Sequence, residues 1–201
     1  MSRFKFRAVD GMDVAPEEWL RIWADRYPSN TYAEHGELIE KYKTLSAADF
    51  VQIGKWKDRA KAESRWKDNT ASVAYRIWMR AASELPKCPE ESAEADFLDD
   101  WSTKKYVDEF ANGPVEKSFG LSRATTLLYF LSGGRFPIFD SRVRKAMTRL
   151  RNSAAPNTVR WYLDSYCSLF SEVADLCGTQ DRRMVDKALF SYGDRKLPFS
   201  N

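Results

Sequence analysis

Asp140 is the acidic residue whose sequence surroundings best suit chemistry. It follows the apolar run Phe136–Phe139 and precedes the basic segment Ser141–Arg151, so it falls at the start of a predicted helix. The helix dipole and the amides of a first turn favour the ionised form of a carboxylate. Such a group can stabilise a developing positive charge or deprotonate a water molecule. The alternative role is an ordinary N-cap, and one carboxylate can perform both.

A glycine-containing turn lies upstream of Asp140, immediately before an apolar helix predicted over residues 121–131. Glycine lets such a turn present backbone N–H groups at a helix N-terminus, where the positive end of the dipole favours a phosphate. The predicted phosphate contacts come from Ser118, Gly120, Ser122 and Arg123. The alternative is an ordinary connection between helices, with glycine present for steric reasons.

The helix predicted after Asp140 is strongly basic. At about 100° per residue, Arg142, Lys145 and Arg149 share one face of it, and Arg144 points elsewhere. We expect this trio to contact nucleic-acid phosphates, with a salt-sensitive and sequence-independent contribution to affinity. A solvated basic face is the alternative. A second basic stretch spans residues 41–67 and an acidic one residues 90–100, so the charge is uneven although its net value is only +3.

The turn and the aspartate segment together resemble the helix-hairpin-helix superfamily of DNA glycosylases. Its members carry a hairpin of the pattern Leu-Pro-Gly-Val-Gly-x-Lys-Thr-Ala, an apolar helix, and an aspartate motif of the type Val-Asp-Thr-His-Val. Phe119-Gly120-Leu121-Ser122 is similar to the hairpin, and Ile138-Phe139-Asp140-Ser141-Arg142-Val143 to the aspartate motif. The similarity covers a small part of the chain.

The resemblance implies a monofunctional enzyme. Ala124 stands where bifunctional members have their Schiff-base lysine, so a lyase step by that route is absent, and Ser122 replaces the second hairpin glycine. The implied reaction is hydrolysis of the N-glycosidic bond of a damaged or modified base, with Asp140 as the catalytic carboxylate and an abasic site as the product. The implied partner is duplex DNA with an extruded nucleotide. Bulky modified bases of phage DNA are one candidate substrate class, which would make the enzyme part of an antiviral defence.

An extruded base needs aromatic faces and polar edges around it. Most tryptophans and tyrosines of the chain recur at helical spacing, which is typical of core packing. Trp56 is different because Lys55 and Lys57 flank it, an arrangement suited to stacking beside phosphates. We therefore predict Trp56 and Lys57 in the base pocket, with a core position for Trp56 as the alternative.

The composition excludes several other classes of protein. The three cysteines have neither paired nor clustered spacing, so no disulfide framework and no iron–sulfur cluster are expected, and the single histidine leaves few ligands for zinc. No cofactor and no metal are predicted. The sequence has no apolar run of about 18 residues and no signal-like start, so we expect a cytoplasmic monomer without membrane contact.

The elements that must position these residues are predicted to be almost entirely helical. Helices are expected from Pro16 to the break at Tyr27-Pro28, over Tyr32–Tyr42, after the Ser46/Asp49 capping box, after Asn69 or Thr70, and over residues 92–111, 121–131, 141–150, 158–176 and 180–192. Residues 3–9 alternate as in an edge strand or a strap.

The predicted fold class is all-α, a compact two-lobed helical domain over residues 1–201 with a helix-hairpin-helix element. The proline-containing break at 85–91 is the predicted boundary, with an N-terminal helical lobe at about 1–88 and a catalytic lobe with the hairpin at about 89–201. Two other functions stay open. The chain could be a non-catalytic helix-hairpin-helix module that binds nucleic acid, or a helical protein whose hairpin resemblance is accidental.

Overall fold

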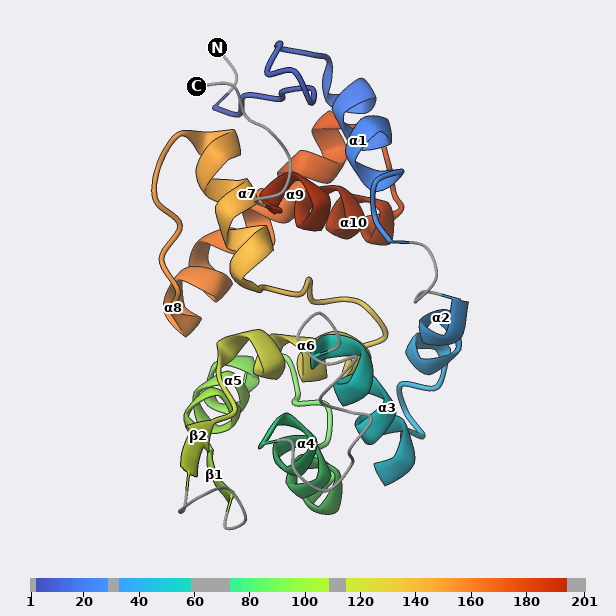
Figure 1. Ribbon diagram of the computed structural model, residues 1–201, viewed down its shortest axis with the longest axis vertical. Coiled ribbons are helices and arrows are strands. Elements are labelled where there is room, and N and C mark those ends of the chain that lie inside the picture. Colours follow the sequence, from blue (N-terminus) through green and yellow to red (C-terminus); the bar gives the residue numbers. More distant parts are fainter. Residues whose placement is uncertain (1–2, 29–32, 59–72, 109–114, 195–201) are drawn as a thin grey trace. The chain divides into compact units, whose positions relative to one another are not determined.

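The computed structural model describes residues 3–28, 33–58, 73–108 and 115–194 of the chain. Helices dominate these residues and the one sheet among them has two short strands, so the fold is mostly helical (Figure 1). The chain forms two compact units, a terminal unit made of residues 1–29 and 136–201 and a central unit made of residues 30–135. The division does not run through residues 85–91, where the sequence placed it. A proline-containing break marks the end of a helix and carries no information on which helices pack together.

The terminal unit is built from segments at both ends of the sequence. Its helices are α1 (Pro16–Ala24), α7 (Ser141–Arg151), α8 (Val159–Trp161), α9 (Cys167–Leu176) and α10 (Arg182–Gly193), and the π-helical turn Tyr162–Tyr166 joins α8 to α9. α10 packs against both α1 and α7. Trp19 and Trp23, one helical turn apart on α1, are fully buried with their rings 5.5 and 5.1 Å from that of Tyr192.

The segment before α1 follows the predicted strap. Phe4, Phe6 and Ala8 are buried, and the basic residues between them are exposed. The Lys5 N–H donates to the Leu150 carbonyl at 2.7 Å, which fastens the strap to the end of α7. Its strand-like pairing is a single bridge between Arg7 and Asp13. The alternation of apolar and basic residues therefore reflects an extended segment with one side buried, which is not part of a sheet.

The central unit contains the remaining described elements: α2 (Ala33–Glu40), α3 (Ala47–Asp58), α4 (Val73–Glu84), α5 (Glu94–Thr103), β1 (Lys105–Asp108), β2 (Val115–Ser118) and α6 (Leu121–Leu131). α3 packs on α4, and α5 packs on α6. A Cβ added at Gly54 would lie 2.3 Å from the Trp78 ring, so α3 and α4 approach as closely as glycine allows. The capping box before α3 is confirmed, because Ser46 N–H donates to Asp49 Oδ2 at 2.7 Å and Asp49 N–H to Ser46 Oγ at 3.3 Å.

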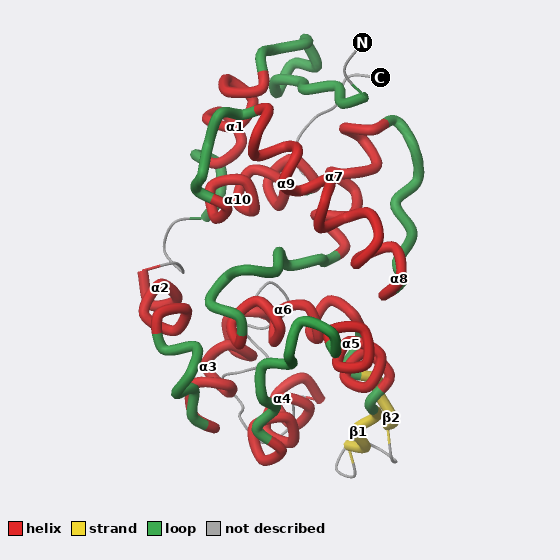
Figure 2. The backbone as a smooth tube through the Cα atoms, turned by 180° about the vertical axis from the view of Figure 1, so that it is seen from behind, coloured by secondary structure: helices red, strands yellow, loops and turns green. Residues whose placement is uncertain are grey.

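The helix predicted over residues 92–111 ends at Thr103, so the prediction is wrong for residues 104–108, and residues 109–111 lie outside the described residues. β1 follows and pairs antiparallel with β2, so that Lys105 faces Ser118 and Asp108 faces Val115 (yellow in Figure 2). Tyr106 is buried with its ring 6.0 Å from that of Phe119. This contact, together with the packing of β1 on α4, favours strand over the helix that the local pattern indicated. The helices expected over 121–131 and 141–150 are confirmed.

Candidate functional site

Asp140 is the N-cap of α7. Its Oδ1 atom accepts hydrogen bonds from the backbone N–H groups of Arg142 and Val143, at 2.9 and 3.0 Å. These are amides that α7 itself cannot satisfy at its first turn. The residue is half-exposed. The capping role that the sequence left open for Asp140 is therefore observed, and the catalytic role stays a prediction.

Two tyrosines hold the backbone that leads into Asp140. The hydroxyl of Tyr162 donates to the Pro137 carbonyl at 2.8 Å, and that of Tyr166 to the Ile138 carbonyl at 3.1 Å. Burial is the largest of the causes that raise the pKa of both tyrosines well above its ordinary value, so both hydroxyls keep the proton that they donate. For Tyr166 the charges of Asp186 and, more weakly, Asp140 act in the same direction.

The two tyrosines come from the π-helical turn, a rare geometry that is frequent at functional sites. Phe139 packs among their rings, 6.0 Å from Tyr162 and 4.8 Å from Tyr166, and lies 5.4 Å from the Trp161 ring. Sequence reasoning missed this cluster, because a Tyr162/Tyr166 spacing of four residues is also typical of ordinary core packing. The partners of the two hydroxyls lie some 25 residues away in the sequence and could not be read from it.

The turn before α6 rests on the end of α5. Phe119 N–H donates to the Lys104 carbonyl at 2.8 Å, and Gly120 N–H donates to the Ser102 carbonyl at 3.0 Å. The β1–β2 hairpin thus leaves α5 and returns beside the same helix end. Gly120 has a φ of 82°, which glycine adopts at little cost, and a Cβ there would meet no atom within 4 Å. The turn therefore faces open space at the N-terminus of α6, where first-turn amides suit an anion.

Arg123 makes its contacts inside the central unit. Its Nε and Nη2 atoms lie 3.1 Å from the two carboxylate oxygens of Asp58, and Nη1 donates to the Phe119 carbonyl at 3.0 Å. Asp58 also accepts the Trp78 indole N–H at 2.7 Å. These contacts use one N–H of each guanidinium nitrogen. Arg123 thus ties α3 to the turn before α6, and its contact with DNA stays a prediction.

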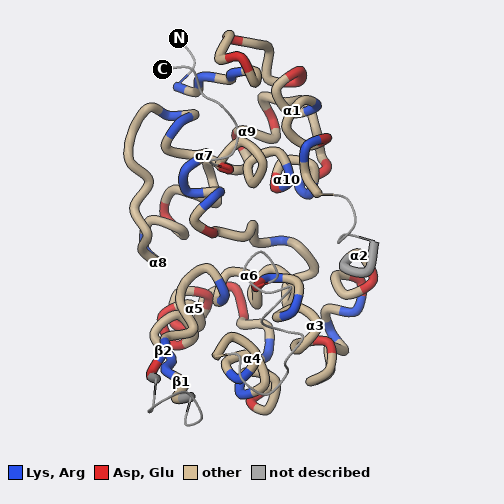
Figure 3. Tube along the Cα trace, viewed as in Figure 1, with Lys and Arg blue, Asp and Glu red and all other residues tan. Residues whose placement is uncertain are grey.

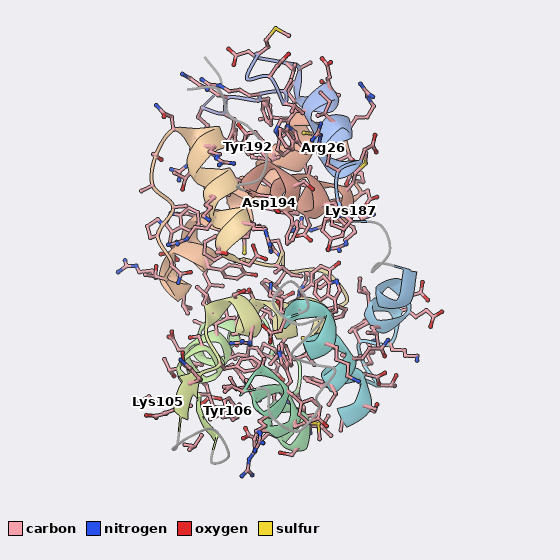
Figure 4. The ribbon with its side chains drawn as sticks, in the orientation of Figure 1. Arg26, Lys105, Tyr106, Lys187, Tyr192 and Asp194 are labelled. Atoms are coloured by element: carbon pink, nitrogen blue, oxygen red, sulfur yellow. The ribbon has the colours of Figure 1, made fainter. Side chains whose placement is uncertain are left out.

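The other residues predicted around the turn have separate surroundings. Ser118 is exposed on β2, opposite the Lys105 labelled in Figure 4. The carbonyl of Ser122 accepts the hydroxyls of Thr125 and Thr126, at 3.2 and 2.8 Å. Ala124, which stands at the lysine position of the resembling motif, is fully buried. The first turn of α6 is thus held by these two hydroxyl bonds and by the burial of Ala124.

Trp56 and Lys57 lie at the end of α3, and both are half-buried. The Trp56 ring meets that of Phe130 edge to face, with the ring centroids 5.7 Å apart. Trp56 thus packs on α6 but is not fully buried, so the structure does not place it in the core as the alternative expected. Stacking on a base stays a prediction for both residues.

The structure separates the three basic residues predicted to share one face of α7. The Arg142 guanidinium lies 4.5 Å from the Phe190 ring and 3.5 Å from the Asp194 carboxylate. Arg149 donates to the Tyr192 carbonyl. Both arginines therefore turn toward α10, at the end where Figure 4 labels Tyr192 and Asp194. Lys145 forms neither an ion pair nor a side-chain hydrogen bond with any residue the structure describes.

The predicted site residues are divided between the two units. The terminal unit holds Asp140, Arg142, Lys145 and Arg149, and the central unit holds Trp56, Lys57, Ser118, Gly120, Ser122 and Arg123. Within the described ranges, no three side chains of the histidine, cysteine, aspartate or glutamate type gather as metal ligands would. None of the described helices is both long and apolar enough to cross a bilayer.

Comparisons with protein-family models, with curated proteins and with solved structures found no match to this chain. Any assignment of function therefore rests on the residues and contacts described above.

Proposed function

We propose that this protein is a monofunctional DNA glycosylase of the helix-hairpin-helix type, with Asp140 as its catalytic carboxylate. The observation that carries the proposal is the way Asp140 is held. Two backbone amides fix its Oδ1 atom, and two buried tyrosine hydroxyls fix the carbonyls of Pro137 and Ile138 before it. A carboxylate that must act on a reacting sugar needs such a fixed position.

The proposed reaction hydrolyses the bond between a deoxyribose and a damaged or modified base. Breaking this bond builds positive charge on the sugar, and the ionised Asp140 stabilises that charge while it orients or deprotonates the attacking water. The amides of Arg142 and Val143 donate to the carboxylate, and donors of this kind favour its charged form. Because Ala124 offers no amine for a Schiff base, the product is an abasic site in an uncut strand.

The turn before α6 supports the DNA-binding part of the proposal. It is the helix-hairpin-helix element that we propose to grip a phosphate through the amides that follow Gly120. Its positive φ and the open space around it allow a close approach of the DNA backbone. In this chain the element is interrupted by the β1–β2 hairpin, which starts and ends at the helix end where the turn is anchored.

The test compares Asp140→Asn with a matched capping variant. Asp181 caps α10 as Asp140 caps α7, with its Oδ1 atom accepting the N–H groups of Arg183 and Met184 at 2.9 and 3.1 Å. Asparagine keeps the acceptor in both caps and removes the charge. Purified variants are incubated with duplexes that carry alkylated, deaminated, oxidised or bulky phage-type bases, and released base and alkali-labile sites are measured. We expect activity to be lost in Asp140→Asn and retained in Asp181→Asn.

A non-catalytic nucleic-acid-binding module is the second candidate. It is favoured by the N-cap bonds, because these bonds are a sufficient structural reason for an aspartate at position 140. Under this candidate, the two asparagine variants bind DNA as the wild type does and no protein releases a base. Base release that survives in Asp140→Asn would remove the catalytic assignment and leave the enzyme without a named carboxylate.

A further inference from the structure

α7 has a packing side and an outward side. The packing side carries four buried apolar residues, Val143, Ala146, Met147 and Leu150. At about 100° per residue, Ser141 and Lys145 lie on the opposite, outward side, and Arg144 lies next to them on the flank away from α10. Thr148 is on the same flank, where its hydroxyl accepts the Ala155 N–H at 3.1 Å. Arg142 and Arg149 lie at the margin and turn toward α10, as their contacts with Asp194 and Tyr192 show. The side away from α10 therefore carries Lys145 together with Arg144, and not with Arg142 and Arg149 as periodicity alone indicated.

The outward side of α7 is basic without a compensating acid. From Ser141 to Arg151 the helix contains no aspartate or glutamate, and its basic residues appear as blue segments in Figure 3. Arg144 and Lys145 are half-exposed, and neither forms an ion pair within the described part of the chain. By contrast, the exposed Arg160 pairs with Asp164, and Arg3 pairs with Glu172. Two adjacent cations left unneutralised suit an anionic ligand.

A third exposed cation, Lys5, lies at the C-terminal end of α7. The Lys5 backbone N–H donates to the Leu150 carbonyl at 2.7 Å, and the Lys5 side chain is exposed. Lys5 therefore lies about 9 Å along the helix axis from Arg144, at about 1.5 Å per residue. Asp140 caps the other end of the helix. Cations that are spread along the helix axis, starting one turn from the carboxylate, suit a linear polyanion better than a small anion.

We propose that the outward side of α7, through Arg144 and Lys145 with Lys5 beyond them, binds phosphates of duplex DNA beside the nucleotide presented to Asp140. The inference rests on the proposed function and names the residues that hold its substrate. A lipid surface fits less well, because none of the large apolar side chains exposed in the described residues lies on α7. A helix that binds a bilayer inserts such side chains.

The test measures DNA affinity as a function of salt. The affinity of the full chain for a fluorescein-labelled duplex is followed by fluorescence anisotropy between low and physiological salt. The variant is Arg144→Gln/Lys145→Gln. The control is Arg21→Gln/Arg26→Gln, which removes the same charge from exposed positions of the same unit away from α7. Circular dichroism verifies that both variants are folded.

The expected result follows from counterion release. Each phosphate neutralised contributes about 0.9 to the slope of log affinity against log salt, so the α7 variant should bind more weakly with a slope shallower by about 1.8. The control should retain the wild-type slope. An unchanged slope in the α7 variant, an equal change in the control, or binding of anionic vesicles in place of DNA overturns the inference.

The outcome is separable from that of the proposed function. If the α7 variant keeps the wild-type slope while wild type releases a base in an Asp140-dependent way, the inference falls and the glycosylase proposal stands. If the slope falls as expected and no DNA yields a free base, the phosphate-binding face stands and the glycosylase proposal falls. A wild type that does not bind duplex DNA removes both.

Discussion

Replacing Arg123 by methionine removes the guanidinium that ties α3 to the turn before α6. Methionine has a helix propensity close to that of arginine, so the change acts on contacts and leaves α6 intrinsically unaltered. The substitution deletes two hydrogen bonds to Asp58, each 3.1 Å long, and one of 3.0 Å to the Phe119 carbonyl. Asp58 keeps the Trp78 indole N–H as a donor, at 2.7 Å. The Asp58 carboxylate thus loses its two bonds from Arg123 and keeps the one from Trp78.

The magnitude follows from the exposure of the pair. The side chains of Arg123 and Asp58 are 24% and 15% exposed. Removing one partner of a fully buried pair costs about 3–5 kcal/mol, and a hydrogen bond to a charged group is worth about 1.5–3 kcal/mol. For this mostly buried pair we expect Arg123→Met to lower the free energy of unfolding by about 2 kcal/mol. Asp58→Asn should cost less, and the double variant should cost less than the sum.

The assay is urea unfolding followed by tryptophan fluorescence, with the free energy compared at constant m-value. The matched control is Glu116→Gln, which breaks a Lys105–Glu116 pair of the same 3.1 Å length whose side chains are 64% and 53% exposed. Solvent screens such a pair, so its loss should cost less than about 1 kcal/mol. Two results would contradict this reasoning. One is a loss of unfolding free energy in Arg123→Met no larger than in the control, and the other is additivity of the Arg123 and Asp58 substitutions. Either would mean that the Arg123–Asp58 contact does not stabilise the turn.

Two further predictions concern the packing of α10 and the capping of α3. A Cβ at Gly193 would lie 1.8 Å from the Arg142 carbonyl oxygen, so Gly193→Ala should cost about 1–3 kcal/mol in thermal unfolding. A Cβ at Gly36 on α2 would meet no atom within 4 Å, so Gly36→Ala should stabilise the fold by about 0.5–1 kcal/mol. If the two glycine substitutions changed the stability equally, the close contact between α7 and α10 would be contradicted. Burial acts to raise the pKa of Asp49, but hydrogen bonds from Ser46 outweigh it and lower the pKa below 3.8. A lowered pKa stabilises the fold above its unfolded value and loses that effect as the pH falls through the folded value. Asp49→Ala should therefore cost about 1 kcal/mol at pH 7 and progressively less as the pH falls below 3.8, and a cost that does not decrease with pH would refute the capping argument.

Local signals in the sequence were sufficient to predict most of the helices. Caps and periodicity act within a few residues, so the capping box at Ser46/Asp49 and the helix starts at Leu121 and Ser141 were predicted correctly. The sequence also selected Asp140 as a residue at a helix start, because the apolar run before it and the basic run after it are contiguous. Its resemblance to a catalytic aspartate motif remains a prediction of the sequence alone.

The tertiary structure decided the contacts that join distant segments. Periodicity ranks the faces of α7 but does not reveal which face α10 covers, so only the fold distinguishes the engaged Arg142 and Arg149 from the outward Arg144 and Lys145. In the same way, a turn arginine can face solvent or a carboxylate, and Asp58 lies 65 residues from Arg123 in the chain. Partners of this kind depend on how helices pack, which no local pattern records. The sequence thus determined where helices and charges occur, and the tertiary structure determined which charges remain available to a ligand.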